Sequence, residues 1–253
     1  MVNARNDWDL SEHGNAVVPV QQLQGLLDSL LSVVRKVLET DWPELFRRYE
    51  AGLLSMADNG WTLVEWSPPN LIPDAVVQDP EQLDAYFTEG YMANNASHLD
   101  ELHRTLVESP EFAQWTLLLE EIFVCIREGR HRVAIPAAFT IIEGLIASSL
   151  HRISNISSSN VSVLKSLKNA GWHEKENLEA FFWRSGIAFL DKVFATSDFA
   201  QSQPPFVNRH WILHGRSSVD WKLADALRLV NALWTLNFLF AILPEQPSVG
   251  TTE

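Results

Sequence analysis

Apolar side chains recur along most of this chain at intervals of three and four residues, the spacing that places them on one face of a helix. The clearest early example runs from about Val20 to Glu39, where leucine and valine form the repeating face. A second helix is expected to begin at Asp41, because this acidic cap is followed by a proline and then by Glu44 three residues on. The turn residues Asp58-Asn59-Gly60 would end that helix.

One segment, Trp61–Trp66, interrupts the helical spacing, which then continues to about residue 243. Trp61–Trp66 has the composition of a short extended segment, and two prolines follow it directly. Residues 131–153 are apolar on nearly all sides, which is typical of the centre of a helix bundle. We therefore predict an all-α protein with one short extended segment. The first of the expected later helices begins at residue 79. The others cover residues 97–107, 112–128, 131–153, 163–169, 174–194 and 219–243.

Charge is distributed unevenly along the 253 residues, whose net charge is −13. Residues 1–126 hold 6 Lys and Arg against 21 Asp and Glu, whereas residues 127–253 hold 13 against 11. The acidic total disfavours loose, charge-driven binding to nucleic acid, and acidic surface also keeps a protein soluble. The best candidate for a boundary between two domains lies within residues 60–77. We expect an N-terminal acidic helical region over 1–77, a helical bundle over 78–243 and a disordered tail over 244–253.

Cysteine content and hydropathy bear on the compartment. The only cysteine, Cys125, cannot form an intramolecular disulfide, and its apolar neighbours are typical of a core thiol. The start of the chain lacks the apolar run of a secretory signal, and no apolar run reaches the 18 or so residues that a membrane span needs. A cytoplasmic protein is therefore expected.

The densest group of chemically active side chains lies between Asn208 and Arg216, where two arginines and two histidines fall within nine positions. Arginine supplies a fixed positive charge and forked donors that suit phosphate. Histidine is the side chain that most readily transfers a proton near neutral pH. Arg209 and His214 stand five positions apart, as Arg-x4-His. These residue types are the ones needed to cleave a phosphodiester.

Helical geometry limits how this group can be arranged. His210 and His214 are four apart and share one helix face. Arg209 and His214 would lie roughly 140° apart around a regular helix. The two converge only if Arg209 lies in the first turn and its long side chain curls round. Asn208 is a good N-cap and marks the helix start there, where free N–H groups would add to an anion site.

Arg209-His210-x-x-x-His214 resembles the Arg-x4-6-His motif of the HEPN superfamily, the higher eukaryote and prokaryote nucleotide-binding domain. In that family a polar residue usually follows the arginine, as His210 does here. The apolar helix around residues 135–144 resembles the bundle helix that precedes the motif in the family. That helix often carries a lone buried acid, and Glu143 occupies the matching place. The resemblance covers roughly residues 80–243.

The resemblance implies a four- or five-helix bundle that forms a homodimer and brings two motifs into one cleft. Many such proteins are metal-independent endoribonucleases of toxin–antitoxin, abortive-infection or other defence systems. Others are non-catalytic RNA-binding or scaffold modules. The expected partners are RNA, a second copy of the chain and an antitoxin or regulatory protein. No cofactor is expected.

RNA carries its own nucleophile for cleavage, the 2′-hydroxyl. His214 is expected to act as the base or the acid, which contributes about 10²–10⁴-fold to the rate of such reactions. Arg209 is expected to stabilise the charge that develops on the phosphorane oxygens. In a homodimer, the His214 of the second copy could take the opposite proton-transfer role. DNA lacks the 2′-hydroxyl and should be cut poorly or not at all.

Five further residues are expected to support this pair. Glu143 could hold Arg209 or a histidine in place by a charge-assisted hydrogen bond. His210 would contact phosphate or orient the pair, and Asn208 would fix the helix start. Arg216 and Trp211 are candidates for contacts to RNA, although tryptophan in a helical bundle is more commonly part of the core.

Two other interpretations stay open. His210 and His214 also have the spacing of two zinc ligands on one helix, with His151, His173 or Glu143 as a third. The glutamate of the His-Glu-x-x-His motif is missing, however. The second alternative is a non-enzymatic interaction module that retains the motif for binding or dimerisation. A separate hypothesis is that the acidic first half restrains the nuclease or binds a partner.

Overall fold

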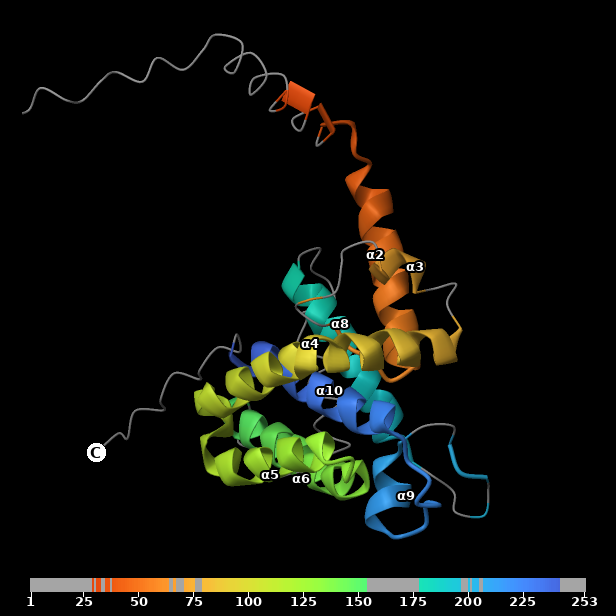
Figure 1. Ribbon diagram of the computed structural model, residues 1–253. Helices are drawn as coiled ribbons and strands as arrows, with labels where there is room; N and C mark the ends of the chain where they lie inside the picture. The colour runs from red at the N-terminus through yellow and green to blue at the C-terminus, as the bar shows by residue number, and fades with distance from the viewer. Residues whose placement is uncertain are drawn as a thin grey trace, which may run out of the picture. The chain divides into compact units, whose positions relative to one another are not determined.

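The computed structural model describes residues 29, 31–32, 35–36, 38–63, 66, 71–75, 79–153, 178–196, 200, 202–204 and 207–241 (Figure 1). Every regular element in these ranges is helical, so the predicted all-α class is confirmed. No helix within them is long and apolar enough to cross a membrane. The expected helix at residues 163–169 and the tail at 244–253 lie outside the described residues.

The chain divides into two compact units, residues 1–45 and residues 46–253. One helix, α2, begins in the first unit and continues into the second. The elements, in chain order, are α2 (Trp42–Asp58), α3 (Leu71–Asp74), α4 (Pro80–Glu108), the 3-10 helix η1 (Pro110–Trp115), α5 (Thr116–Arg127), α6 (His131–Ile153), α8 (Leu178–Val193), α9 (Arg209–Leu213) and α10 (Leu223–Ala241).

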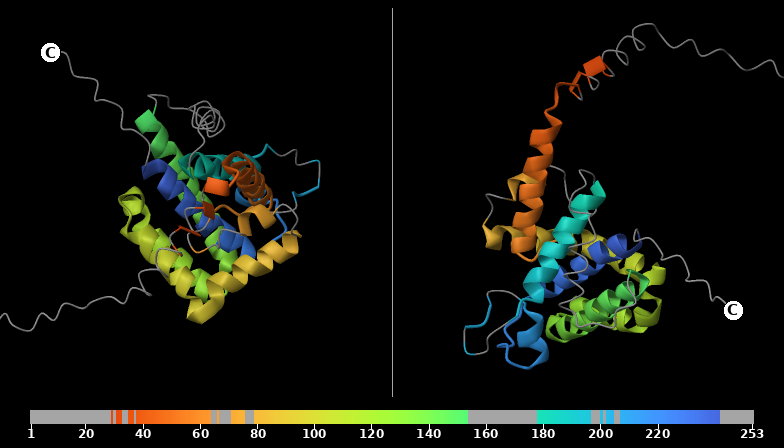
Figure 2. Two further views of the ribbon diagram at one scale, coloured as in Figure 1. Left: turned by 90° about the horizontal axis from the view of Figure 1, so that it is seen from above. Right: turned by 180° about the vertical axis from the view of Figure 1, so that it is seen from behind.

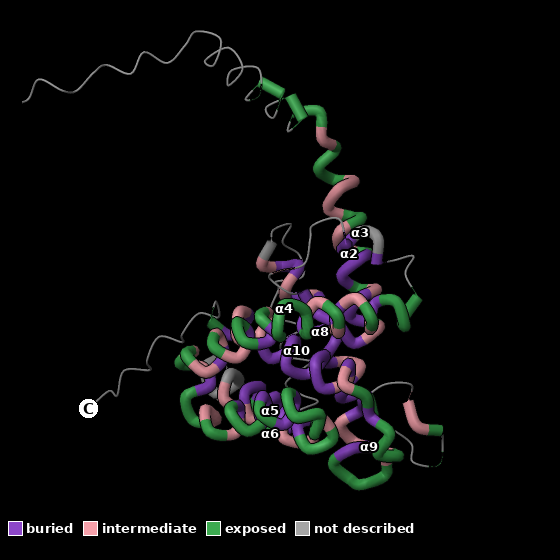
Figure 3. The backbone as a smooth tube through the Cα atoms, viewed as in Figure 1, coloured by how far each residue is buried: buried purple, intermediate pink, exposed green. Residues whose placement is uncertain are grey.

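The central helix of the second unit is α10. It packs against α4, α6 and α8, while α5 packs on α6 (Figures 1 and 2). Most of α10 is buried, as the largely purple tube in Figure 3 shows. By contrast, α6 leaves Val133 and Thr140 exposed, so the all-round apolar sequence of residues 131–153 did not identify the central element. The last helix, α10, has a more amphipathic sequence but lies at the centre of the bundle, because α4, α6 and α8 pack around it.

The expected extended segment does not form a strand in its described part, Trp61–Leu63. Instead, side chains of α10 satisfy its polar groups. Asn231 Nδ2 donates to Thr62 O at 3.0 Å and to Thr62 Oγ1 at 2.9 Å. Thr235 Oγ1 lies 2.7 Å from Thr62 Oγ1 and 3.3 Å from the carbonyl oxygen of Leu63. Buried backbone groups need partners, and here a helix supplies them in place of a neighbouring strand.

The packing of this segment also bears on where the chain divides into two units. Trp61 and Leu63 are buried in the same core as Leu71 and Ile72, together with side chains of the later helices. The boundary therefore falls between Leu45 and Phe46, and not near residue 77 as the composition suggested. The described residues between 46 and 75 belong to the bundle because their apolar side chains complete its core.

A kink interrupts α4 at residues 93–96, close to the predicted start of a new helix at residue 97. Asn94, Asn95 and Ala96 have positive φ angles of 50°, 59° and 62°. Asparagine tolerates this left-handed region better than most residues, whereas alanine does not. Ala96 is nevertheless buried, so the surrounding packing holds the kink.

Gly90, on the first half of α4, makes room for the indole of Trp66. A methyl group on Gly90 would lie 2.3 Å from Trp66 Cη2 and 2.6 Å from Cζ3, so the rigid ring would have to move. We expect Gly90→Ala to lower the free energy of unfolding by about 1–3 kcal/mol, measured by urea denaturation.

Gly186→Ala, in α8, is the matched control. Its nearest contact, at 2.7 Å, is the flexible tip of Leu239, which can turn away. Both changes gain the same helix propensity, about 1 kcal/mol, so the difference between them isolates the effect of the ring. Equal stabilities for the two variants would show that Trp66 is not held against Gly90.

Candidate functional site

Asn208 starts α9 and fixes the position of the Arg-x4-His motif. Its Oδ1 accepts from the backbone N–H groups of His210 at 3.0 Å and Trp211 at 3.3 Å. Its Nδ2 donates to Ala195 O at 3.1 Å, which ties the helix start to the segment after α8. The N-cap prediction is confirmed. These two N–H groups are already bonded to Asn208, so they are not available to the anion that was expected at this helix start.

Arg209, in the first turn of α9, reaches across to α6. Its Nε donates to Oε1 of Glu143, and the two side chains are only 23% and 22% exposed. This is the contact that the lone acid of an apolar helix suggested. Partial burial makes such a pair stronger than one in open solvent. The contact uses one of the five N–H donors of the guanidinium, whose fork otherwise suits an anion.

His210 and His214 lie one turn apart on the same helix face. Their ring centroids are 6.1 Å apart and the rings are nearly parallel, with an interplanar angle of 10°. His210 is partly buried, whereas His214 caps the C-terminal end of α9 and is exposed. Gly215, with a φ of 65°, then reverses the chain.

Electrostatics joins these side chains into one group. Burial lowers the pKa of His210 below its ordinary value, and the nearby charges of Arg209 and His214 lower the pKa further. Glu143 opposes this effect. His210 therefore interacts with all three of the other groups. We call Arg209, His210, His214 and Glu143 the Arg-His cluster.

The arrangement differs from the expected one in the place of His210. The sequence assigned the active pair to Arg209 and His214, with His210 in support. In the structure Arg209 turns toward α6, His214 lies beside His210, and His210 interacts with both. The i,i+4 spacing was the available signal for the histidine pair. The partial burial of His210 could not be read from it.

The two candidates for RNA contacts have different surroundings. Arg216 is exposed and follows the turn at Gly215, where its backbone N–H bonds to Trp211 O at 2.8 Å. Trp211 is only 8% exposed, so its ring belongs to the interior of the protein. The suggested stacking of a base on Trp211 is therefore not supported, and the alternative of a core tryptophan is favoured.

Metal binding was the rival interpretation of the histidine pair. Within the described ranges, no group of three or more His, Cys, Asp and Glu side chains is arranged to hold a metal ion. His173 lies outside those ranges, and the surroundings of the His151 side chain are not described either. Metal analysis of the purified protein is the test of the zinc interpretation, which stoichiometric zinc would favour.

Comparisons with protein-family models, with curated proteins and with solved structures find no match to this chain. Its function is therefore argued from the chemistry of the cluster and from the motif.

Proposed function

We propose that this protein is a metal-independent endoribonuclease of the HEPN type and that the Arg-His cluster is its active site. The observation that supports this proposal best is that Arg209, held by Glu143, lies at the start of the same short helix that brings the rings of His210 and His214 to within 6.1 Å of each other. Perturbed titratable groups that gather a cation and two imidazoles are characteristic of sites that move protons. The motif alone would be weaker support, because short motifs arise by chance.

Cleavage in this site would use the 2′-hydroxyl of the substrate. A neutral imidazole accepts the 2′-hydroxyl proton while the 2′-oxygen attacks phosphorus. The bond from phosphorus to the 5′-oxygen then breaks, and an imidazolium gives a proton to that leaving oxygen. His210 suits the base role because its pKa is lowered. His214 is exposed one turn away and can supply the other proton-transfer group.

Arg209 would stabilise the charge that grows on the phosphorane oxygens. Glu143 holds the guanidinium by its Nε, which fixes the direction of the remaining donors. Glu143 also offsets part of the positive charge, so its role is positioning. One chain can provide both imidazoles. In the homodimer that the motif implies, a second copy would double the site.

The first test mixes purified protein with total RNA in excess EDTA. Wild type should fragment RNA and leave DNA intact, while His214→Ala, purified in the same way, should fragment RNA at least about 10²-fold more slowly. If wild type cleaves no RNA with or without added metal, the endoribonuclease proposal fails. Binding of RNA or protein without cleavage would then favour the interaction module. Equal cleavage by His214→Ala would remove the site assignment.

The pH dependence tests the base role of His210. Because its pKa is lowered, the His210 ring is mostly neutral at pH values at and above about 6.5, the ordinary pKa of histidine. Protonation of the ring at lower pH removes the base. The cleavage rate is therefore expected to fall as pH falls, with a midpoint below about 6.5. His210→Gln should remove that acidic limb from the profile. A midpoint clearly above 6.5 in wild type would contradict this assignment.

As part of the same proposal, the acidic N-terminal segment restrains the nuclease or binds an antitoxin or regulatory protein. Deleting residues 1–77 would remove Trp61 and Leu63 from the core, so it cannot test this idea cleanly. Deleting residues 1–40 leaves α2 and the second unit in place and tests the part of the restraint that comes from this segment, which holds 5 of the 21 Asp and Glu of residues 1–126. That deletion should raise RNA cleavage or toxicity on expression. Unchanged activity would count against restraint by this segment.

A further inference from the structure

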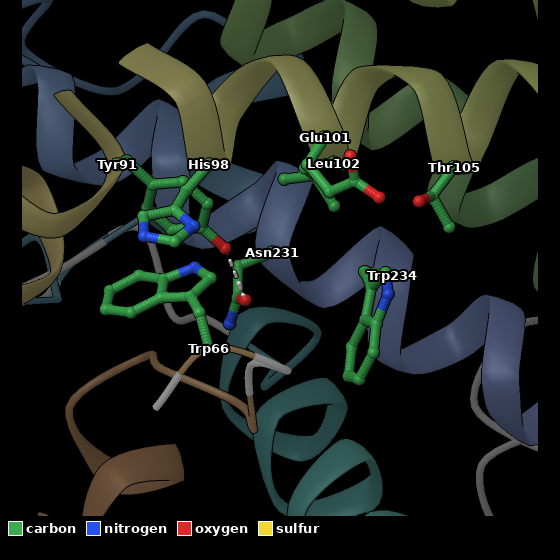
Figure 4. A pocket seen from close by; sticks show the side chains of 8 residues that line it. All are labelled: Trp66, Tyr91, His98, Glu101, Leu102, Thr105, Asn231 and Trp234. Carbon is green, nitrogen blue, oxygen red and sulfur yellow. Dashed lines mark hydrogen bonds between the residues drawn. The ribbon is translucent and has the colours of Figure 1, made fainter. Parts of the chain in front are cut away.

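A pocket of about 220 Å³ opens between α4, α10 and Trp66 (Figure 4). It involves none of the residues of the Arg-His cluster. Four aromatic rings line it: Trp66, Tyr91 and His98 on one side and Trp234 across the gap. Such a volume is smaller than the roughly 300–1,000 Å³ of pockets for drug-sized ligands, so only a compact ligand fits.

The packing of Trp66 explains the shape of one wall. Its ring stacks on His98 at a centroid distance of 4.9 Å and meets Tyr91 edge-on at 5.3 Å. Tyr91 and His98 lie on opposite sides of the α4 kink, and both reach the same indole. Gly90 leaves the space in which the ring lies. This wall is therefore built by packing and does not depend on a ligand.

The side chains of Tyr91 and Asn231, at the base of the pocket, are already paired. Tyr91 donates its hydroxyl to Asn231 Oδ1 at 2.8 Å, and Asn231 in turn bonds to Thr62. Burial raises the pKa of Tyr91, which keeps the phenol neutral. The base thus offers shape and apolar surface, and it carries no charge of its own.

The charge lies at the rim instead, on α4. Figure 4 shows the Glu101 carboxylate and the Thr105 hydroxyl at the same end of the pocket, on the helix that faces Trp234. A hydrogen bond from Arg104 lowers the pKa of Glu101, so the carboxylate is ionised near neutral pH. A carboxylate can accept several donors, so Glu101 can serve Arg104 and a ligand together. No Lys or Arg side chain is among the residues that line the pocket.

We propose that this pocket binds a small organic cation of the ammonium class, with the positive group against the indole of Trp234 and close to the Glu101 carboxylate, because the Trp66 ring is already stacked on His98 and Tyr86. Indole faces attract cations through the ring quadrupole, and a desolvated contact of this kind strengthens binding by about tenfold or more. The net charge of −13 attracts cations from a distance. Cation binding at this site is independent of the proposed RNA cleavage.

Choline is the probe for the test, with 3,3-dimethyl-1-butanol as its uncharged analogue of the same shape. Binding is followed by NMR through the indole N–H signal of Trp234, assigned with Trp234→Phe. Choline should shift that signal and bind at least about tenfold more tightly than the alcohol, as a cation–π contact of this size implies. No shift with choline, or equal affinities for the two probes, would overturn the proposal.

Substitutions of two glutamates separate the carboxylate of the pocket from its neighbour. Glu101→Gln should weaken choline binding by up to about fivefold, as expected for the loss of an exposed ion pair. Glu108 also contacts Arg104, at 3.6 Å, but does not line the pocket, so Glu108→Gln should leave the affinity unchanged. Both side chains are exposed, and neither change should alter folding. Equal losses in the two variants would contradict a cation bound at Glu101.

Discussion

Replacing Arg209 with alanine should slow RNA cleavage about 10²–10³-fold, the loss found when one donor to a developing oxyanion is removed. The guanidinium is held on Glu143 in a partly buried position, which fixes the direction of its remaining donors. Arg209→Lys should recover only part of the rate, because an ammonium group lacks the planar fork. Single-turnover rates on a defined RNA are the measurement.

Loss of an ion pair also affects folding, and Arg184→Ala controls for that effect. Arg184 is paired with Glu50 at 2.8 Å and is similarly shielded, at 18% exposure. It lies on α8, outside the Arg-His cluster. Arg184→Ala should therefore lower stability yet preserve the cleavage rate per folded molecule. If Arg184→Ala slows cleavage as strongly as Arg209→Ala does, the guanidinium of Arg209 has no special role in catalysis.

Replacing Arg228 with methionine should lower the free energy of unfolding by about 3–5 kcal/mol, the cost of removing one partner from a buried ion pair. The side chain of Arg228 is only 8% exposed and contacts Asp84 and, at 2.6 Å, Asp225. Its Nε also donates to Asn59 O at 3.1 Å, and its guanidinium lies 5.4 Å from the centre of the Trp61 ring. Without Arg228, two shielded carboxylates would lack their cation.

Urea denaturation measures this effect, and Arg104→Met is the control. Arg104 also contacts two carboxylates, but it is fully exposed to solvent, which screens the interaction. Its replacement should leave the denaturation midpoint almost unchanged. Similar midpoints for Arg228→Met and Arg104→Met would mean that the interior pair does not hold α10 to α4.

The helices and the cap at Asn208 could be predicted because each depends on local rules, whereas the contact between Glu143 and Arg209, 66 positions apart, was suggested by the motif and the lone acid. Apolar spacing determines a helix face, and a capping residue acts on the next three positions. The lone acid of an apolar helix needs a cation, and the motif supplied one in the same bundle.

The links between distant parts of the chain could not be predicted in this way. Asn231 and Thr62 are 169 positions apart, and Arg228 and Asp84 are 144 apart. Each of these polar residues reads locally as an ordinary surface position of a helix or loop. Their burial depends on which helices pack together, and the spacing of residues along one helix does not specify that choice.

The end groups of a defined RNA test the central claim most directly, after incubation with the protein in EDTA. Attack by the 2′-hydroxyl leaves a 2′,3′-cyclic phosphate and a free 5′-hydroxyl. Wild type should produce these ends, and His214→Ala and Arg209→Ala, purified identically, should not. Ends that carry a 3′-hydroxyl and a 5′-phosphate, or the cyclic phosphate produced equally by both variants, would contradict the assignment of the Arg-His cluster as a site of RNA cleavage.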